Sequence, residues 1–375
     1  MSWSSAIFMG GLGNIYSSGT NYLPLYHYFL LVYSHVQGSL ESIHNNIYSL
    51  KYFTLIFDVV CVYISFLFVK DKLKNSLLSC AMSLLILFNI AYLYNTVIWA
   101  QVDSIFTAFL FLAFYFSIKN KILLPTIFLI LAVNMKLQAI IFIPFIVLIL
   151  LPTAIKKFKL KSFLHWLSIT ASLQFIILLP FILSGELNNV IDVVMSSIGA
   201  FPAVSLNAYN IWCWLIEGNL MYIPDTNSFL ELSYYHWGLF MFTLLYFFTL
   251  FPLIRNRFLL LSNSSIHSIH LNKLLIMGTL IPLIFFFFNT QMHERYSHPM
   301  LLFAGTYAIL NKKYIVYTLL SIAYFLNLEL VLDYFNLENS NIFFLNPDFV
   351  AALFFAAILL LFFNLYKGES KTEVK

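Results

Sequence analysis

The sequence predicts an all-α fold, a polytopic transmembrane helix bundle with about eleven spans and a re-entrant or interfacial helix near the N-terminus. Three observations support this fold class. Of the 375 residues, 61% are hydrophobic, 10% are charged and 41 are phenylalanine, which is more apolar surface than a soluble core of this length can bury. About eleven apolar runs approach the length of a spanning helix. Clusters of Lys and Arg follow alternate runs, as the positive-inside rule requires.

Each expected span is an apolar run bounded by polar links. The segment 22–36 is also apolar, but it is short and contains Pro24, His27 and His35, so a re-entrant or interfacial helix is favoured there over a full span. The spans are expected at 51–69, 76–94, 104–118, 122–135, 138–152, 163–184, 236–254, 273–289, 298–311, 314–332 and 348–366.

The basic clusters predict which links face the cytoplasm. They comprise Lys70, Lys72 and Lys74; Lys119 and Lys121; Lys156, Lys157, Lys159 and Lys161; Arg255 and Arg257; Lys312 and Lys313; and the tail lysines. The opposite face then receives 1–50, 95–103, 134–138, 185–235, 290–297 and 333–347. Since no span precedes residues 1–50, we expect an upstream helix or an unconventional crossing.

One membrane domain is expected at 1–366, with an outer segment at 1–50, a long outer loop at 185–235 and a cytoplasmic tail at 367–375. The net charge of +4 comes from clusters at helix ends and forms no basic stripe, so nucleic acid is not an expected partner. The three cysteines show no disulfide framework and no paired metal-ligand spacing. We expect no cofactor, with a divalent cation left open.

The first candidate for chemistry is Gln101-Val102-Asp103, where a carboxylate stands at the outer edge of an apolar helix. A charge at mid-membrane costs about 2.5 to 3.5 kcal/mol on insertion scales, and less near the interface. A functional role for Asp103 would explain why a charge is present there despite this cost. The alternative is a helix cap, because an acid at a helix N-terminus bonds free amides and suits the dipole.

The second candidate is Lys136 with Gln138, between two strongly apolar runs on the predicted outer face. The positive-inside rule would not choose a lysine there, and a bound anion would explain it. A lysine is a good point-charge ligand for phosphate, and Gln138 could add a donor. The alternative is that Lys136 extends toward lipid headgroups.

The third candidate is 289–298, the densest polar tract of the chain. Arg295 suits bidentate phosphate binding, and His293 or Glu294 could orient it or move a proton. Alternatively, Glu294 and Arg295 form an interfacial ion pair and His293 is a hydrogen-bonded loop residue.

The fourth candidate lies in the loop 185–235 and contains Asn207, Asn210 and Trp212. Long loops in compact proteins are usually functional or disordered. Amides and aromatic rings suit sugar hydroxyls and sugar faces, but the same residues form ordinary interfacial belts.

Ahead of these four stretches the chain carries Asn21 to Tyr26 and Phe57-Asp58. In this order, over most of the chain, the stretches resemble the integral membrane glycosyltransferases of the GT-C superfamily, specifically the bacterial mannosyltransferase-like group related to the enzymes that build GPI anchors. They are also distantly similar to the glucosyltransferases that use dolichyl-phosphate-glucose, which carry a Tyr-Pro-Pro-Leu stretch, a Lys-Gln pair and a His-Glu-Lys motif.

The resemblance implies a GT-C-like fold and an inverting hexosyltransferase of the bacterial inner (plasma) membrane, with its active face non-cytoplasmic. The donor would be a polyprenyl-phosphate sugar, mannose before glucose, that reaches the site from the membrane lipids. The acceptor would be a hydroxyl of a cell-envelope glycan or of a lipid-linked molecule.

The resemblance also implies roles for individual residues. Donor phosphate would be bound by Lys136, Arg295 and Gln138. The family's acidic residue in the first outer loop would precede Met1, and Asn21 stands where related enzymes can carry Asp. The catalytic candidates among the residues present are therefore Asp103, then Glu294, with His293. The sugar and acceptor pocket would be shaped by Gln101, Asn207, Asn210, Trp212, Tyr296 and Tyr22.

Two alternatives stay open. A lipid-linked oligosaccharide flippase or transporter should show broken helices and polar residues near the bilayer midplane. A non-catalytic subunit of an envelope glycan assembly complex would fit the absence of the first-loop acid.

Overall fold

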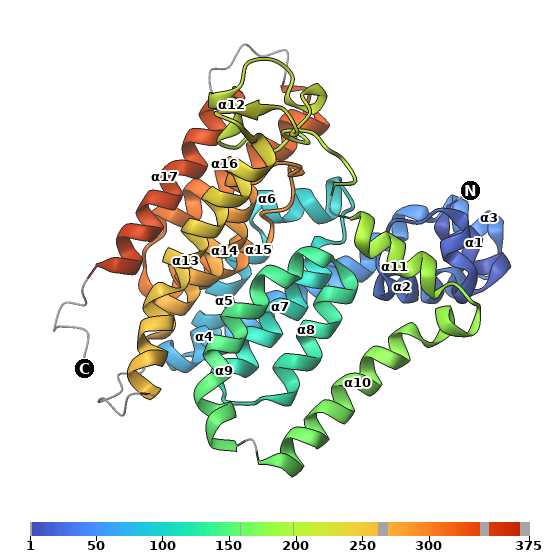
Figure 1. Cartoon of the computed structure of the whole chain (residues 1–375), viewed down its shortest axis with the longest axis horizontal. Coiled ribbons are helices and arrows are strands. Elements are labelled where there is room, and N and C mark those ends of the chain that lie inside the picture. Colours follow the sequence, from blue (N-terminus) through green and yellow to red (C-terminus); the bar gives the residue numbers. More distant parts are fainter. Residues whose placement is uncertain (1, 158, 198, 262–268, 338–344, 368–375) are drawn as a thin grey trace. The chain divides into compact units, whose positions relative to one another are not determined.

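The computed structural model describes residues 2–157, 159–197, 199–261, 269–337 and 345–367 (Figure 1). The chain divides into two compact units, which are described separately. Unit 1 comprises Met1–Ile64 and Ala100–Phe201, and unit 2 comprises Ser65–Trp99 and Pro202–Lys375. The predicted single domain at 1–366 stays a prediction, and most of the predicted tail lies outside the described residues.

The described residues are mostly helical, as predicted. Strands β1 (Ser228–Phe229) and β2 (Leu232–Ser233) form one short antiparallel hairpin. Seven helices of the described part are long and apolar enough to cross a membrane, or up to eight if the bent pair Ser76–Leu87 and Ile90–Ile98 is one span. This finding indicates a multi-pass membrane protein.

Three of the expected spans form shorter apolar helices, at Asp103–Ile118, Leu123–Met135 and Pro299–Asn311. A spanning helix needs roughly 20 residues, so these three are too short to cross alone in a straight line. The count of about eleven spans therefore stays a prediction.

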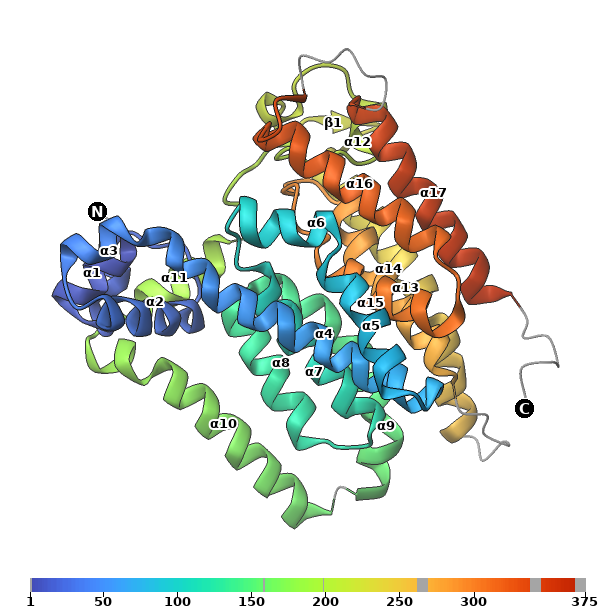
Figure 2. The ribbon, with the colours of Figure 1, turned by 180° about the vertical axis from the view of Figure 1, so that it is seen from behind.

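Unit 1 consists of a group of short N-terminal helices and several longer apolar ones (Figures 1 and 2). The short helices are α1 (Trp3–Gly10), the 3-10 helix η1 (Leu12–Ser18), α2 (Pro24–Gln37), α3 (Leu40–Asn45) and the 3-10 helix η2 (Ile47–Leu50). The others are the first part of α4 (Lys51–Leu73), α7 (Asp103–Ile118), α8 (Leu123–Met135), the 3-10 helix η4 (Leu137–Phe142), α9 (Ile143–Lys157), α10 (Leu160–Leu183) and α11 (Leu187–Ser196).

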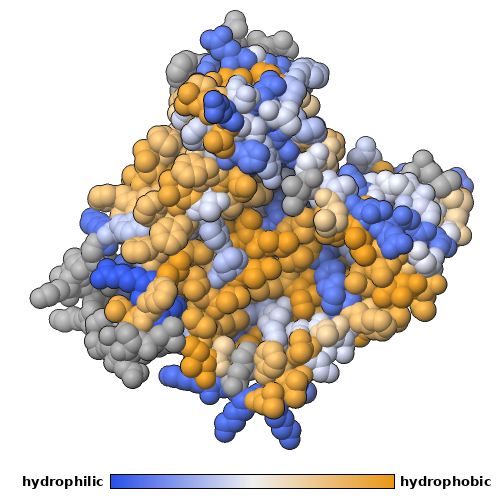
Figure 3. All heavy atoms as spheres, viewed as in Figure 1, coloured by the Kyte–Doolittle hydropathy of each residue, from blue (hydrophilic) through white to orange (hydrophobic). Residues whose placement is uncertain are grey.

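Helix α7 lies against α8 and α9 and is buried along most of its length. A pair of amides joins α8 to α10: Asn134 Nδ2 donates to Gln174 Oε1 at 2.8 Å, and Gln174 Nε2 donates to Asn134 Oδ1 at 3.2 Å. Only 17% of the apolar window of α10 is buried inside the protein, so most of its side chains face outward. Apolar side chains cover much of the face in Figure 3, as expected for contact with lipid.

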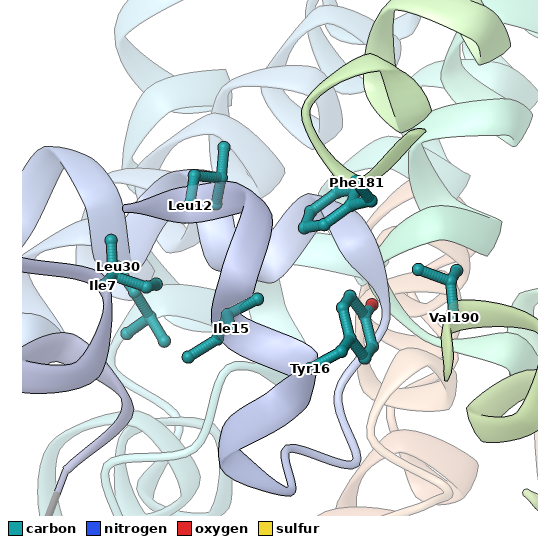
Figure 4. Close-up of a cluster of buried hydrophobic side chains, with 7 residues drawn as sticks. All are labelled: Ile7, Leu12, Ile15, Tyr16, Leu30, Phe181 and Val190. Atoms are coloured by element: carbon teal, nitrogen blue, oxygen red, sulfur yellow. The ribbon is translucent and has the colours of Figure 1, made fainter. Parts of the chain in front are cut away.

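The N-terminal helices have a core of their own, which α10 and α11 complete. Its buried side chains come from α1, η1, α2, α10 and α11 and are shown in Figure 4: Ile7, Leu12, Ile15, Tyr16, Leu30, Phe181 and Val190. Tyr16 packs edge-on against Phe181, with ring centroids 5.2 Å apart. Helix α2 has 14 residues, and its predicted interfacial placement stays a prediction.

Unit 2 is a bundle around α14, with one end covered by the segment 202–233 (Figures 1 and 2). Its elements are the end of α4, α5 (Ser76–Leu87), α6 (Ile90–Leu93), the π-helical turn η3 (Tyr94–Ile98), α12 (Trp212–Leu215), the 3-10 helix η5 (Leu220–Tyr222), the hairpin, α13 (Tyr234–Leu261), α14 (Leu271–Phe288), α15 (Pro299–Asn311), α16 (Ile315–Leu332) and α17 (Pro347–Tyr366).

Helix α14 is the most buried candidate span, with 78% of its apolar window inside the protein. It packs against α13, α15 and α17, and glycine allows two of these close approaches. A Cβ on Gly238 of α13 would lie 2.9 Å from the carbonyl oxygen of Phe288, and a Cβ on Gly278 would lie 2.3 Å from the Phe303 ring.

The loop expected at 185–235 contains regular structure. It holds α11 in unit 1, and α12, η5 and the hairpin in unit 2. Short helices inside a polar stretch carry little periodic signal, which is why the sequence pattern predicts only a loop.

We expect Gly13→Ala to destabilise unit 1 by about 1 to 3 kcal/mol, because overpacking a tight contact forces backbone or side-chain shifts. A Cβ at this position would lie 1.9 Å from Ser184 Oγ and 2.7 Å from the Pro180 carbonyl oxygen. The measurement is the thermal unfolding midpoint of detergent-solubilised protein. Gly10→Ala is the matched control, because no atom lies within 4 Å of its added Cβ. Equal midpoints for the two variants would contradict the prediction.

Candidate functional site

Asp103 and Lys136 form an ion pair inside unit 1. Lys136 Nζ donates to Asp103 Oδ1, and the Asp103 side chain is fully buried whereas 14% of the Lys136 side chain is exposed. A buried carboxylate is tolerated in apolar surroundings only when a counter-charge or hydrogen-bond donors compensate it. Lys136 supplies that charge.

The backbone at the end of α8 directs Lys136 toward α7. Met135 ends the helix, and Lys136 is extended, with φ −149° and ψ 127°, before η4 begins at Leu137. The ammonium group reaches the first turn of α7, where it also lies 5.5 Å from the centroid of the Phe106 ring. A cation over an aromatic face is stabilised further when water is excluded.

The Asp103–Lys136 ion pair bears on the alternatives considered for these residues, which were a helix cap for Asp103 and a side chain extended toward lipid headgroups for Lys136. Val102 occupies the N-cap position of α7 and makes no side-chain cap, so Asp103 lies in the first helical turn and not at the cap. Its negative charge still suits the helix dipole. Lys136 points to a carboxylate, which differs from the extended, headgroup-seeking side chain of the alternative.

A second buried carboxylate, Asp58, lies on α4 in the same unit and is fully buried. Three residues later, Cys61 Sγ is 3.9 Å from the carbonyl oxygen of Ser104, and Phe57 packs against Phe109 with ring centroids 5.3 Å apart. These contacts bring this part of α4 against α7. The resemblance includes Asp58 but assigns it no role. In the sequence, Asp58 is distinguished only as a single acidic residue within an apolar run.

The other predicted residues of unit 1 have the following places. Gln101 is half-buried just before α7, and Gln138 is half-buried in η4, two residues after Lys136. Tyr22 lies among the N-terminal helices, where its ring is 5.2 Å from Trp3 and 4.6 Å from Tyr26. Gln101 and Gln138 are each two residues from a member of the ion pair in sequence, and the predicted roles of all three residues stay predictions.

In unit 2, His293, Glu294 and Arg295 form one charged cluster. Glu294 is 2% exposed; its Oε1 accepts from Arg295 Nη1, and its Oε2 lies 3.7 Å from His293 Nδ1. The ring of Tyr296 packs against His293 at 5.1 Å, and the Arg295 guanidinium lies 5.9 Å from the same ring. The ion pair named as an alternative is therefore present, and His293 adjoins it.

The same tract is held by buried neighbours of unit 2. Tyr324 Oη lies 3.3 Å from His298 Nδ1, 3.3 Å from Asn95 Oδ1 and 3.4 Å from the Arg295 carbonyl oxygen. The His298 ring packs 4.8 Å from the ring of Tyr92. Arg295 is thus positioned by contacts on both its side chain and its backbone.

The electrostatic surroundings of Glu294 lower its pKa. Burial has the largest single effect and raises the pKa, but the hydrogen bond from His293 and the positive charges of Arg295 and His293 together outweigh burial. The carboxylate form is favoured, so Glu294 is better suited to orienting His293 and Arg295 than to accepting a proton.

The segment 203–212 docks against the end of α14 and the tract that follows it. Leu206 N donates to the Met292 carbonyl oxygen at 2.9 Å, and Asn207 forms a β-bridge with His293. Asn207 is half-buried and has a left-handed φ of 66°. Unit 2 therefore brings Asn207 beside the charged cluster, and its predicted role in a sugar pocket stays a prediction.

Asn210 and Trp212 lie behind this surface and are buried. Asn210 Nδ2 donates to the Phe286 carbonyl oxygen at 3.1 Å, and Trp212 Nε1 donates to the Phe288 carbonyl oxygen at 3.1 Å. Both side chains bond the free carbonyls at the C-terminus of α14. These contacts account for both residues structurally, and their predicted role with sugar stays a prediction.

Two polar residues that sequence reasoning missed hold this docked segment. Asp225 accepts from Thr290 Oγ1 at 2.9 Å and from Gln291 Nε2 at 2.7 Å. Asn327 on α16 donates to the Asn207 carbonyl oxygen at 2.8 Å and accepts from Tyr209 N at 3.1 Å. Asn327 could have been noticed as an amide inside an apolar run, whereas Asp225 has no distinguishing sequence signal.

No group of three or more His, Cys, Asp or Glu side chains that could hold a metal ion occurs among the described residues.

We expect Lys136→Met to lower the unfolding midpoint strongly, because it leaves Asp103 buried without its counter-charge, a loss of about 3 to 5 kcal/mol for broken buried pairs. Adding Asp103→Asn should recover most of that loss, because the neutral pair carries no desolvated charge. Thermal unfolding of the two single variants and the double variant in detergent measures this coupling. Additive losses in the double variant would contradict the ion pair.

We expect Glu294 to make the stability of the protein depend on pH in acid. Its folded pKa lies below the ordinary value of 4.5, so its contribution is fully present above pH 4.5 and is lost as the pH falls through the folded pKa. Unfolding midpoints measured from neutral pH downward should therefore fall more steeply for the native protein than for Glu294→Gln. Parallel curves would be inconsistent with this assignment.

Comparison of the sequence with protein-family models and with curated proteins finds no match to either. The resemblance to GT-C glycosyltransferases therefore stays a prediction from the motifs.

Proposed function

We propose that this protein is a membrane glycosyltransferase that moves a hexose, mannose first and glucose next, from a polyprenyl-phosphate donor to a hydroxyl of a glycan or lipid-linked acceptor on the non-cytoplasmic face of a bacterial inner membrane. The proposal combines the resemblance with the charged clusters of each unit. In each unit, the side chains proposed for the chemistry are held in place by ion pairs.

The observation that carries the proposal is Lys136. It is a cation at a helix break in an apolar unit, with its ammonium fixed by Asp103 and partly exposed. A lysine is a good point-charge ligand for phosphate, and the ion pair with Asp103 holds the Lys136 ammonium in place. Asp103 therefore acts as a positioning residue. An ion-paired carboxylate is a poorer proton acceptor, which disfavours Asp103 as the base.

In unit 2, His293 is the group best suited to proton transfer. Its side chain is 24% exposed, and Glu294 lies on its Nδ1 side, an arrangement that orients an imidazole. Arg295 is 17% exposed and suits a phosphate oxygen.

The proposed step balances as a direct displacement with inversion. The acceptor oxygen forms a bond to the anomeric carbon while the bond from that carbon to the phosphate oxygen breaks. The electron pair of the broken bond leaves with polyprenyl phosphate, whose charge the ammonium of Lys136 stabilises. The acceptor proton passes to a general base.

We expect the folded double variant Asp103→Asn, Lys136→Met to lose about 10²- to 10³-fold in transfer rate, the usual cost of removing a charge-stabilising donor. Purified full-length protein is offered radiolabelled polyprenyl-phosphate-mannose or polyprenyl-phosphate-glucose with a mixture of envelope glycans. Lys161→Met, which alters an exposed lysine of α10, is the control and should keep its rate. Full transfer by the double variant would show that Lys136 takes no part in the reaction.

A second function, movement of a lipid-linked glycan across the bilayer, is favoured by one observation. Helix α5 and the segment Ile90–Ile98 are bent by 55° at a short break, as in a broken span or a re-entrant loop, and discontinuous helices are common in transporters. Liposomes containing the protein and a fluorescent lipid-linked sugar separate the two functions. Flipping without transfer would support the transporter, and transfer without flipping would support the enzyme.

A further inference from the structure

A cavity of about 320 Å³ lies in unit 1, apart from the Asp103–Lys136 pair. Three segments line it: the link between α7 and α8 with the start of α8, the end of α9, and the first turns of α10. The lining residues are Asn120, Lys121, Ile122, Leu123, Leu124, Lys157, Ser162, His165 and Trp166. Its volume falls within the range of small-ligand sites.

The walls of the cavity are fixed by hydrogen bonds between the helices. Lys157 Nζ donates to the Asn120 carbonyl oxygen at 3.2 Å, and Thr153 Oγ1 donates to Asn120 Oδ1 at 2.9 Å. On the other side, Trp166 Nε1 donates to Thr126 Oγ1 at 3.1 Å. Asn120 itself has a left-handed φ of 56°, which turns the chain sharply between α7 and α8. The basic side chains are therefore carried by a defined framework.

The charge of the lining is one-sided. Lys121 and Lys157 are exposed and come from different basic clusters, and neither Asp nor Glu is among the described residues that line the cavity. Lys157 has one hydrogen bond to a neutral carbonyl, so its ammonium keeps donors for an anion. The imidazole of His165 and the hydroxyl of Ser162 add further polar groups. Separate lysines at helix ends would satisfy the positive-inside rule without meeting at one cavity.

The apolar part of the lining points to a lipid and not to a soluble anion. Ile122, Leu123 and Leu124 border the cavity together with the indole of Trp166. The first turns of α10 continue this surface outward, where Leu164 and Leu167 are exposed. In Figure 3, hydrophilic side chains gather at the α9–α10 end beside apolar surface. A cationic cavity edged by lipid-facing helices suits a phosphate headgroup whose acyl chains stay in the bilayer.

We propose that this cavity binds the headgroup phosphate of an anionic membrane phospholipid, with Lys121 and Lys157 as its charge partners and Trp166 beside the glycerol. Lysine is suited to the task because an ammonium meets a phosphate as a point charge without a fixed direction. The inference is independent of the proposed transfer reaction.

The test measures lipid binding to the purified full-length protein in detergent by native mass spectrometry. Phosphatidylglycerol and phosphatidylcholine with the same acyl chains are titrated separately. We expect phosphatidylglycerol to bind about tenfold tighter or more, since each lysine near an anionic lipid contributes on the order of 1 kcal/mol. Equal binding of the two lipids would overturn the proposal.

Two double variants with the same loss of charge locate the site. Lys121→Ala with Lys157→Ala should abolish the preference for phosphatidylglycerol. Lys156→Ala with Lys161→Ala changes exposed lysines of the same helix ends that do not line the cavity, and it should keep the preference. Equal losses of the preference in both double variants would mean that general surface charge causes it, which would overturn the proposed site. Lys121→Arg with Lys157→Arg keeps both charges and should still bind, which separates loss of the site from loss of the fold.

A final measurement distinguishes binding of the whole lipid from binding of a phosphate group alone. Inorganic phosphate at millimolar concentration should weaken the apparent affinity for phosphatidylglycerol by less than twofold if the acyl chains share in binding, since buried CH₂ groups add to the affinity of a lipid and are absent from free phosphate. Complete displacement by inorganic phosphate would overturn the lipid as the occupant.

Discussion

Charged groups that leave water must find their counter-charges inside the protein, and this constraint governs both charged clusters of the chain. No water in a hydrocarbon layer can compensate a lone carboxylate, so each buried acid needs a donor within reach. Asp103 meets this need with Lys136, and Glu294 meets it with Arg295. Both cations remain partly exposed while both acids are nearly or fully buried. In each pair the carboxylate therefore holds the cationic side chain in place.

The constraint also explains where these pairs occur. Lys136 stands at the break between α8 and η4, and Arg295 lies in the turn between α14 and α15. Broken helices expose backbone groups that must be satisfied, and such breaks are tolerated at membrane depth only where protein or water surrounds them. In unit 2 the docked segment performs this task, because Asn210 and Trp212 bond the last carbonyls of α14. A stable helix end and a partly exposed His293 are thus products of the same packing.

Within each unit, the apolar helices are held by close packing and a few buried amides. Lipid is as apolar as leucine, so burying hydrocarbon gives little preference for one helix neighbour over another. Small residues and hydrogen bonds decide the neighbours instead. Gly238 lets α13 approach the end of α14, and the Asn134–Gln174 pair joins α8 to α10. The same logic applies to the cavity framework, where Trp166 bonds Thr126.

The sequence by itself determined the fold class and the approximate position of every long apolar helix. Composition excludes a soluble core, and apolar runs of about 20 residues separated by polar links predict helices in a membrane. It also identified Lys136, Asp103 and the tract from His293 to Tyr296 as polar groups that apolar surroundings must compensate. It could not predict pairs between different helices, because residues such as Asp103 and Lys136 are adjacent only after folding. Tertiary structure alone decided that Asp225 and Asn327 hold a loop, that three expected spans are short, and that Lys121 and Lys157 meet at one cavity. The physical reason is that local periodicity reports which face of a helix is apolar, whereas a partner across tens of residues is chosen by packing.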